Sequence, residues 1–140
     1  MSEEQTQQLL YQMQMLENLF VELTQKENSI INIIREANSA IHSIKGIDTQ
    51  SESDSLVPLG LGAFMKSKVD SSEKIIINVG SGVAIEKNHN DAINYLESRL
   101  KELEIALQDT NQQRQQVASN LEQGKQQMQN LMQKSQNPTI

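Results

Sequence analysis

Two long stretches of the sequence repeat apolar residues with alternating steps of four and three. In the first stretch the repeated positions are Leu9, Met13, Leu16, Phe20, Leu23, Glu27, Ile30, Ile34, Ala37, Ile41 and Ile44. In the second they are Ile93, Leu96, Leu100, Leu103, Leu107, Thr110, Arg114, Val117, Leu121, Gly124, Met128 and Leu131. This spacing averages about 3.5 residues per repeat, which is typical of a coiled-coil seam. The chain is therefore predicted to form two long helices, over residues 1–46 and 88–134.

The two seams match each other when the helices run antiparallel. The apolar positions alone pair Leu9 with Leu131, and the same register places Glu27 beside Arg114. The other layers are Met13 with Met128, Leu23 with Val117, Ala37 with Leu103 and Ile44 with Leu96. Glu27 and Arg114 are the only charged residues of the two seams, and a slip in register would bury each without its partner. We therefore predict that they form a register-setting pair.

The segment between the helices changes to the pattern of short strands. Residues 47–55 are polar and acidic and are predicted to be a linker. Residues 56–87 contain the runs LVPLG, AFMKSKV, KIIINV and VAIE, separated by the turn sequences GLG, DSS and GSG. They predict two β-hairpins, with Pro58 at an edge or a bulge. Both faces of KIIINV are apolar, so Ile75, Ile76 and Ile77 are expected to need other chains for burial.

The predicted fold is thus mainly α with a small β platform: a long antiparallel two-helix coiled coil joined by two β-hairpins. Residues 135–140 are expected to form a disordered tail. The chain has two Phe, two Tyr and no Trp, which is too little bulky apolar material for an ordinary globular core. Its apolar groups must be buried along the seam or against other subunits.

Composition argues against several classes of partner and location. The formal net charge is −6, and the twelve Lys and Arg are scattered, so a nucleic-acid partner is not expected. The absence of Cys excludes disulfides and fits a reducing compartment. The first residues lack the pattern of a signal peptide, and no apolar run is long enough to span a membrane. We expect a cytoplasmic protein without a membrane partner.

No motif in the sequence points to catalysis, a metal or another cofactor. His42 and His89 are the only histidines, and neither has a second ligand at helical spacing. The glycine pairs Gly60/Gly62 and Gly80/Gly82 are not followed by the residues of a phosphate-binding loop, so hairpin turns are the better interpretation. The carboxylates are expected to be solvated. The chain is predicted not to be an enzyme.

Both predicted helices carry apolar side chains where the chain's two ends should meet. Some lie on the seam, namely Leu9, Met13, Met128 and Leu131. Others lie off it, namely Leu10, Tyr11, Met15 and Met132. Flexible methionine side chains suit a surface that meets many partners. The alternative is that these residues only close the end of the coil or pack on a neighbouring helix.

The β-segment also resembles a known family. The stretches LVPLGLGAFMKSKV and KIIINVGSGVAIEKNHNDAINYLESRL are similar to the α-class prefoldin subunits, most closely the archaeal kind. The motif positions that carry the resemblance are Val57, Pro58, Leu59, Gly60, Gly62, Ala63, Val79, Gly80, Gly82, Ile85, Glu86 and Lys87. Leu61 departs from the family pattern, which often has Gly or a small polar residue there.

The resemblance implies an ATP-independent chaperone subunit in a heterohexamer of two α-class and four β-class chains. Such a complex holds unfolded client proteins at the tips of its coiled-coil arms and passes them to a group II chaperonin. The client-binding residues would then be Leu9, Leu10, Tyr11, Met13, Met15, Met128, Leu131 and Met132. Subunit assembly would use Val57, Pro58, Leu59, Phe64, Ile75, Ile76, Ile77, Val79, Val83 and Ile85. The competing hypothesis is a prefoldin-like coiled-coil scaffold without client-holding activity.

Overall fold

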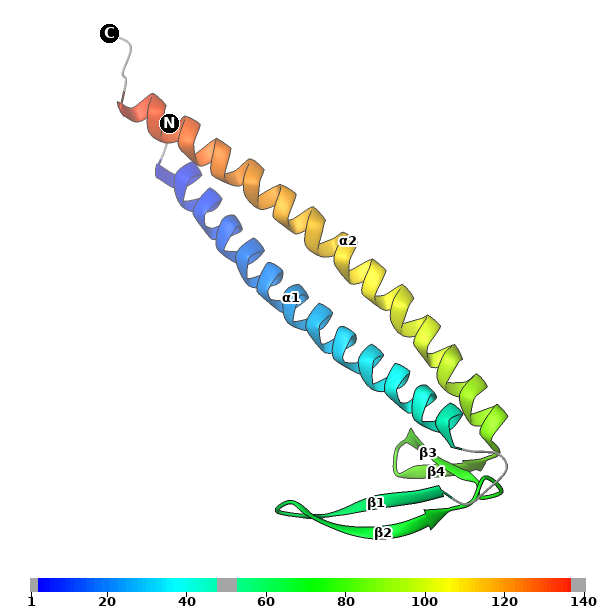
Figure 1. The fold of residues 1–140 in the computed structure, drawn as a ribbon. Helices are drawn as coiled ribbons and strands as arrows, with labels where there is room; N and C mark the ends of the chain where they lie inside the picture. Colours follow the sequence, from blue (N-terminus) through cyan, green and yellow to red (C-terminus); the bar gives the residue numbers. More distant parts are fainter. Residues whose placement is uncertain (1–2, 48–52, 137–140) are drawn as a thin grey trace. The chain divides into compact units, whose positions relative to one another are not determined.

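The structure is a computed structural model that describes residues 3–47 and 53–136. Its elements are α1 (Glu3–Gly46), β1 (Ser53–Gly60), β2 (Ala63–Val69), β3 (Ile75–Gly80), β4 (Val83–Lys87) and α2 (His89–Gln136) (Figure 1). Two long helices joined by two small hairpins are the predicted fold, which is confirmed. The chain divides into an arm unit, residues 1–32 with 104–140, and a hairpin unit, residues 33–103. Each unit is described by itself.

Burial in the arm unit follows the predicted seam. Every seam position there is buried or half-buried, and Leu23, Ile30 and Val117 are each less than a tenth exposed. Thr110 is a polar seam residue and is only 2% exposed. Its hydroxyl donates a 2.8 Å hydrogen bond to the backbone oxygen of Ala106, so this buried polar group is satisfied within its own helix.

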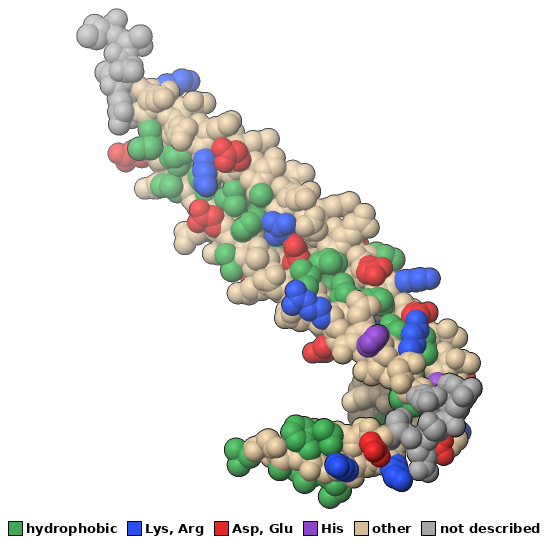
Figure 2. Space-filling model, in the orientation of Figure 1, with side chains coloured by type: hydrophobic (Ala, Val, Ile, Leu, Met, Phe, Trp, Pro, Cys, Tyr) green, Lys and Arg blue, Asp and Glu red, His purple; other side chains and the backbone are tan. Residues whose placement is uncertain are grey.

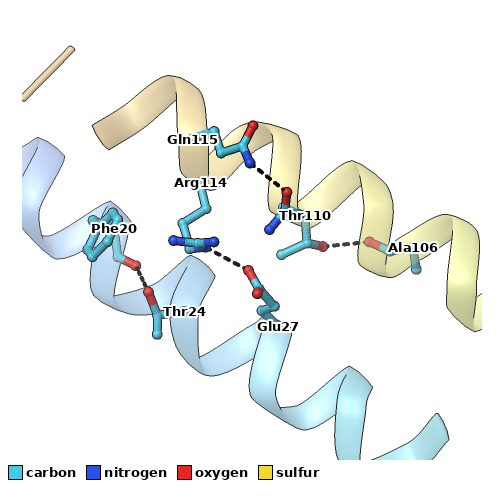
Figure 3. A network of polar contacts seen from close by, with 8 residues as sticks. Phe20, Thr24, Glu27, Ala106, Thr110, Arg114 and Gln115 are labelled. Carbon is cyan, nitrogen blue, oxygen red and sulfur yellow. Dashed lines mark hydrogen bonds and ion pairs between the residues drawn. The ribbon is translucent and has the colours of Figure 1, made fainter. Parts of the chain in front are cut away.

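The predicted charge pair lies in the seam of the arm unit. Arg114 Nε donates to Glu27 Oε2 over 2.7 Å (Figure 3). The side chains of Arg114 and Glu27 are 29% and 18% exposed, so the pair is largely removed from water. The guanidinium also lies 6.0 Å from the centroid of the Phe20 ring, within the range of a cation–π contact. Glu27 and Arg114 are therefore in contact in the seam, and their role in setting the register stays a prediction.

The hairpin unit has a small core where the helix ends meet the second hairpin. Ile44, Ile77 and Ala92 are its buried members, and Ile75, Ile93, Tyr95 and Leu96 pack against it. Asn88 caps α2, since its side-chain oxygen accepts a 2.8 Å hydrogen bond from the backbone N–H of Asp91. This hydrogen bond is one of the two that make up a capping box.

The hairpins are two separate antiparallel pairs, β1 with β2 and β3 with β4. Pro58 lies next to an irregularity in the β1–β2 register, as expected for a residue without an N–H. Each hairpin closes through two residues of positive φ, Leu61-Gly62 in the first and Ser81-Gly82 in the second. Such mirror-image turns match the twist of the strands and favour Gly and small polar residues.

Some predicted boundaries and one burial expectation need correction. β1 begins at Ser53 and not at residue 56, because Ser53–Ser55 pair with the far end of β2. Helix α2 extends to Gln136, two residues beyond its predicted end, a difference common at fraying helix ends. The rest of the predicted linker, residues 48–52, and of the predicted tail, residues 137–140, lies outside the described residues. The expectation that Ile77 needs another chain is wrong, because Ile44 and Ala92 of the same chain bury it.

The Glu27–Arg114 pair predicts that reversing both charges restores stability lost when only one is reversed. Arg114→Glu should lower the free energy of unfolding by about 2 kcal/mol, because it places two carboxylates in a half-buried seam. Adding Glu27→Lys should recover more than half of that loss. Thermal unfolding followed by far-UV circular dichroism measures both effects.

A matched control is Arg99→Glu, which breaks the exposed ion pair of Arg99 with Glu102 within α2. It should cost about 0.5 kcal/mol or less. A double variant no more stable than Arg114→Glu alone would contradict the role of the pair in setting register.

Candidate functional surfaces

The arm unit ends where α1 begins and α2 finishes (Figure 1). The structure divides the residues predicted for this end into two sets. The half-buried seam residues are Leu9, Met13, Met128 and Leu131. The residues that are more than half exposed are Leu10, Tyr11, Met15 and Met132. Closing the coil therefore accounts for the first set, whereas the second set remains on the surface of this chain.

Close packing at this end depends on Gly124. The residue is buried on α2, and a Cβ built on it would lie 3.1 Å from Met13 Cγ on α1. That distance is shorter than an ordinary van der Waals contact, so Met13 fills the space that a side chain at position 124 would take. Gly124 thus lets the helices close at a layer where the sequence pattern shows a missing apolar residue.

A shallow, open groove, made of two adjoining hollows, follows one face of α1. One hollow of about 610 Å³ is lined by Gln12, Met15, Leu16, Asn18, Leu19 and Glu22. A second hollow, lined by Glu4, Gln7, Gln8, Tyr11 and Gln12, shares Gln12 with the first. Leu19 is 41% exposed and was missed by the sequence reasoning, although its spacing of four from Met15 and of eight from Tyr11 places it on the same stripe.

The facing helix offers much less apolar surface in the arm unit. Among the described residues of α2 in this unit, the large exposed apolar side chains are Ile105 and Met132. Amide side chains cover much of the remainder, and some bond to each other at helical spacing, Gln115 to Asn111 and Gln116 to Asn120. The arm unit is therefore asymmetric, with exposed apolar groups gathered on α1 (Figure 2).

The hairpins expose most of the residues predicted for assembly. More than a third of the side-chain surface is accessible at Val57, Pro58, Leu59, Phe64, Ile76, Val79, Val83 and Ile85. Ile75 is half-buried and Ile77 is buried against the helices. Leu56, Leu61 and Met65 are also exposed, and the sequence reasoning did not single them out. Both faces of the first hairpin are therefore open in this chain.

Polar groups in the hairpin unit have structural roles. Asp70 accepts a 3.1 Å hydrogen bond from the backbone N–H of Ser72, and this bond and one from the Ser72 hydroxyl lower the pKa of the Asp70 carboxyl. The ring Nε2 of His89 lies 3.0 Å from the backbone oxygen of Glu73 and ties the turn to the start of α2.

The described residues contain no cluster of three His, Cys, Asp or Glu side chains suited to a metal ion. No helix in the described part of the chain is long and apolar enough to cross a membrane.

Comparison with known proteins identifies the same fold and sequence family. The model of the family described as "Prefoldin subunit" matches residues 9–134. The prefoldin subunit alpha of Nitrosopumilus maritimus is 54% identical over 133 residues, which cover 95% of this chain and 92% of the relative.

Two solved structures share the fold at low sequence identity. The filamentous PFD from Methanocaldococcus jannaschii has a TM-score of 0.67 at 21% identity, covering 79% of this chain and 92% of that one. The prefoldin beta subunit from Thermococcus strain KS-1 has a TM-score of 0.66 at 16% identity, covering 91% of each chain.

The contact of Met13 with Gly124 predicts a background-dependent effect of alanine. In a Met13→Ala background, Gly124→Ala should stabilise the arm by about 1 kcal/mol, the usual gain in helix propensity. In the natural background the gain should fall below about half of that, because Met13 must move. Chemical denaturation of the four chains of this cycle measures the coupling. Equal gains in both backgrounds would show that Met13 does not press on position 124.

Proposed function

Because the chain belongs to the prefoldin family, and within it to the archaeal type of α-class subunit, we propose that it holds non-native proteins and delivers them to a group II chaperonin. The family is one of chaperone subunits and not of enzymes. The observation that carries the holding role is the set of exposed apolar side chains on α1 and at the end of α2. Unfolded chains expose the same kind of surface, and covering it is favourable at about 25 cal/mol per Å².

Weak apolar contacts suit the holding of non-native proteins. The groove on α1 is open and not an enclosed cavity, so a single client segment would lose only part of its hydration on binding. Several arms acting on one unfolded chain would raise the overall affinity, while each contact remains reversible. Holding by this mechanism needs no nucleotide.

Assembly is the second part of the proposal. We infer that residues 56–87 form the assembly platform, in which two copies of this chain join four β-class subunits. The exposed faces of both hairpins support this, since an isolated two-stranded hairpin is at best marginally stable in water. Partner strands would cover apolar groups that this chain leaves open.

A scaffold without client-holding activity is the alternative function. It would use the same hairpins for assembly and the arm to join defined partner proteins. The two functions differ at the exposed residues of the arm's end, because a scaffold does not need them to capture unfolded chains.

The tip residues provide the test of client holding. Replacing Leu10, Met15 and Met132 with Ser should leave the complex assembled and reduce suppression of client aggregation several-fold, because the exposed apolar contact surface is lost. Light scattering of a chemically unfolded client diluted into the complex measures this. The matched control replaces Val21, Ile33 and Ile105 with Ser. These residues are similarly exposed but lie away from the end of the arm, so this variant should still suppress client aggregation. Full suppression by the tip variant would favour the scaffold.

Substitutions of two neighbouring isoleucines on β3 distinguish a role in subunit assembly from a role in folding. Ile76 is 68% exposed, so Ile76→Ser should leave the helix content of the chain intact and weaken the six-chain complex. Ile77 is 9% exposed, so Ile77→Ala should destabilise the chain by about 2–4 kcal/mol. Native mass spectrometry measures the first effect and thermal unfolding the second. A normal complex with Ile76→Ser would remove this residue from the interface.

A further inference from the structure

We propose that the groove on α1 selects client segments with an apolar centre and a Lys or Arg near each end. This inference rests on the proposed holding function and adds a chemical preference to it. Apolar side chains occupy the middle of the groove, namely Tyr11, Met15 and Leu19. A carboxylate stands at each end, Glu4 in one hollow and Glu22 in the other.

The length of the groove fits a short extended segment. Glu4 and Glu22 lie eighteen positions apart in one helix, which corresponds to about 27 Å at the usual helical rise. An extended chain covers that distance in about eight residues. A segment of this length can place apolar side chains over Tyr11, Met15 and Leu19 while its two ends reach the two carboxylates.

The charges of α1 favour a basic segment. Residues 3–25 contain Glu3, Glu4, Glu17 and Glu22 and no Lys or Arg. Neither Glu4 nor Glu22 has an ion pair with another residue in the described part of the chain. Their charges are therefore available to a ligand.

Cations from the facing helix do not line the groove. In the arm unit, α2 carries Arg114, Lys125 and Lys134, and Arg114 is already paired with Glu27. Lys125 and Lys134 are exposed and border neither hollow. These two residues, and Lys26 one helical turn beyond Glu22 on α1, make the net charge of the unit less negative, but the charged residues that border the hollows are Glu4 and Glu22. Figure 2 shows acidic, basic and hydrophobic side chains interspersed along the arm.

Fluorescent peptides of about eight residues test the preference on the complete assembled complex. Three peptides share one apolar centre and carry Lys, Gln or Glu at both ends. Binding followed by fluorescence anisotropy at low salt should rank them Lys, then Gln, then Glu. In the variant E4Q/E22Q, the advantage of the Lys peptide over the Gln peptide should fall about fivefold, while the Gln peptide binds as before. Native mass spectrometry verifies that each variant complex is intact.

The variant E3Q/E17Q is the matched control, because it removes the same charge from the same helix at positions that do not line the groove. It should change the advantage of the Lys peptide by less than about twofold. An equal loss in both variants would overturn the inference in favour of the general acidity of α1. Equal binding of all three peptides by the natural complex would overturn it too and leave the holding function standing. If the natural complex bound none of them and did not suppress aggregation, the proposed function itself would fail.

Discussion

The structure depends on keeping one register between two helices, and the pair of Glu27 with Arg114 lies in the seam, where it would oppose a slip. The apolar seam alone would tolerate a slip, because side chains of similar size recur every three or four residues. A slip would move each charge against apolar neighbours without its partner, at a cost of several kcal/mol. The 2.7 Å contact and the nearby Phe20 ring therefore do more for specificity than for stability. Contacts across the seam, such as that of Met13 with Gly124, follow from this register.

The fixed register divides the apolar side chains of the arm unit into two sets. The seam residues are buried against the facing helix, and Met13 occupies the space that a side chain at position 124 would take. Residues one position away, such as Leu10, cannot turn inward without breaking the seam. The Gln-rich surface of α2 contributes few apolar groups of its own. The exposed stripe on α1 is thus a consequence of the coil geometry and not an imperfection of its packing.

Much of this could be predicted from the sequence, because a coiled coil is specified by local spacing. The seam positions and the two hairpins follow from patterns within a few residues, and matching the two seams places Glu27 beside Arg114. The burial of Ile77 could not be predicted in this way, since it depends on how the helix ends meet β3. The groove on α1 was missed for a related reason. The spacing of Leu19 from Met15 places both on one stripe, but only the three-dimensional surface shows that this stripe borders a hollow together with Glu22.

The first hairpin differs from the arm in how much burial its own chain provides. Nearly every residue of β2 is exposed, and the turn places Leu61 at a φ of 50°, where the second hairpin has Ser81 at 54°. An L residue at such an angle destabilises the folded state. The destabilisation is smaller for a small polar residue, because its side chain can hydrogen-bond to the nearby backbone. A leucine that is also fully exposed gains no burial within its own chain. The first hairpin therefore receives little burial from its own chain, whereas the arm buries its seam between its own two helices.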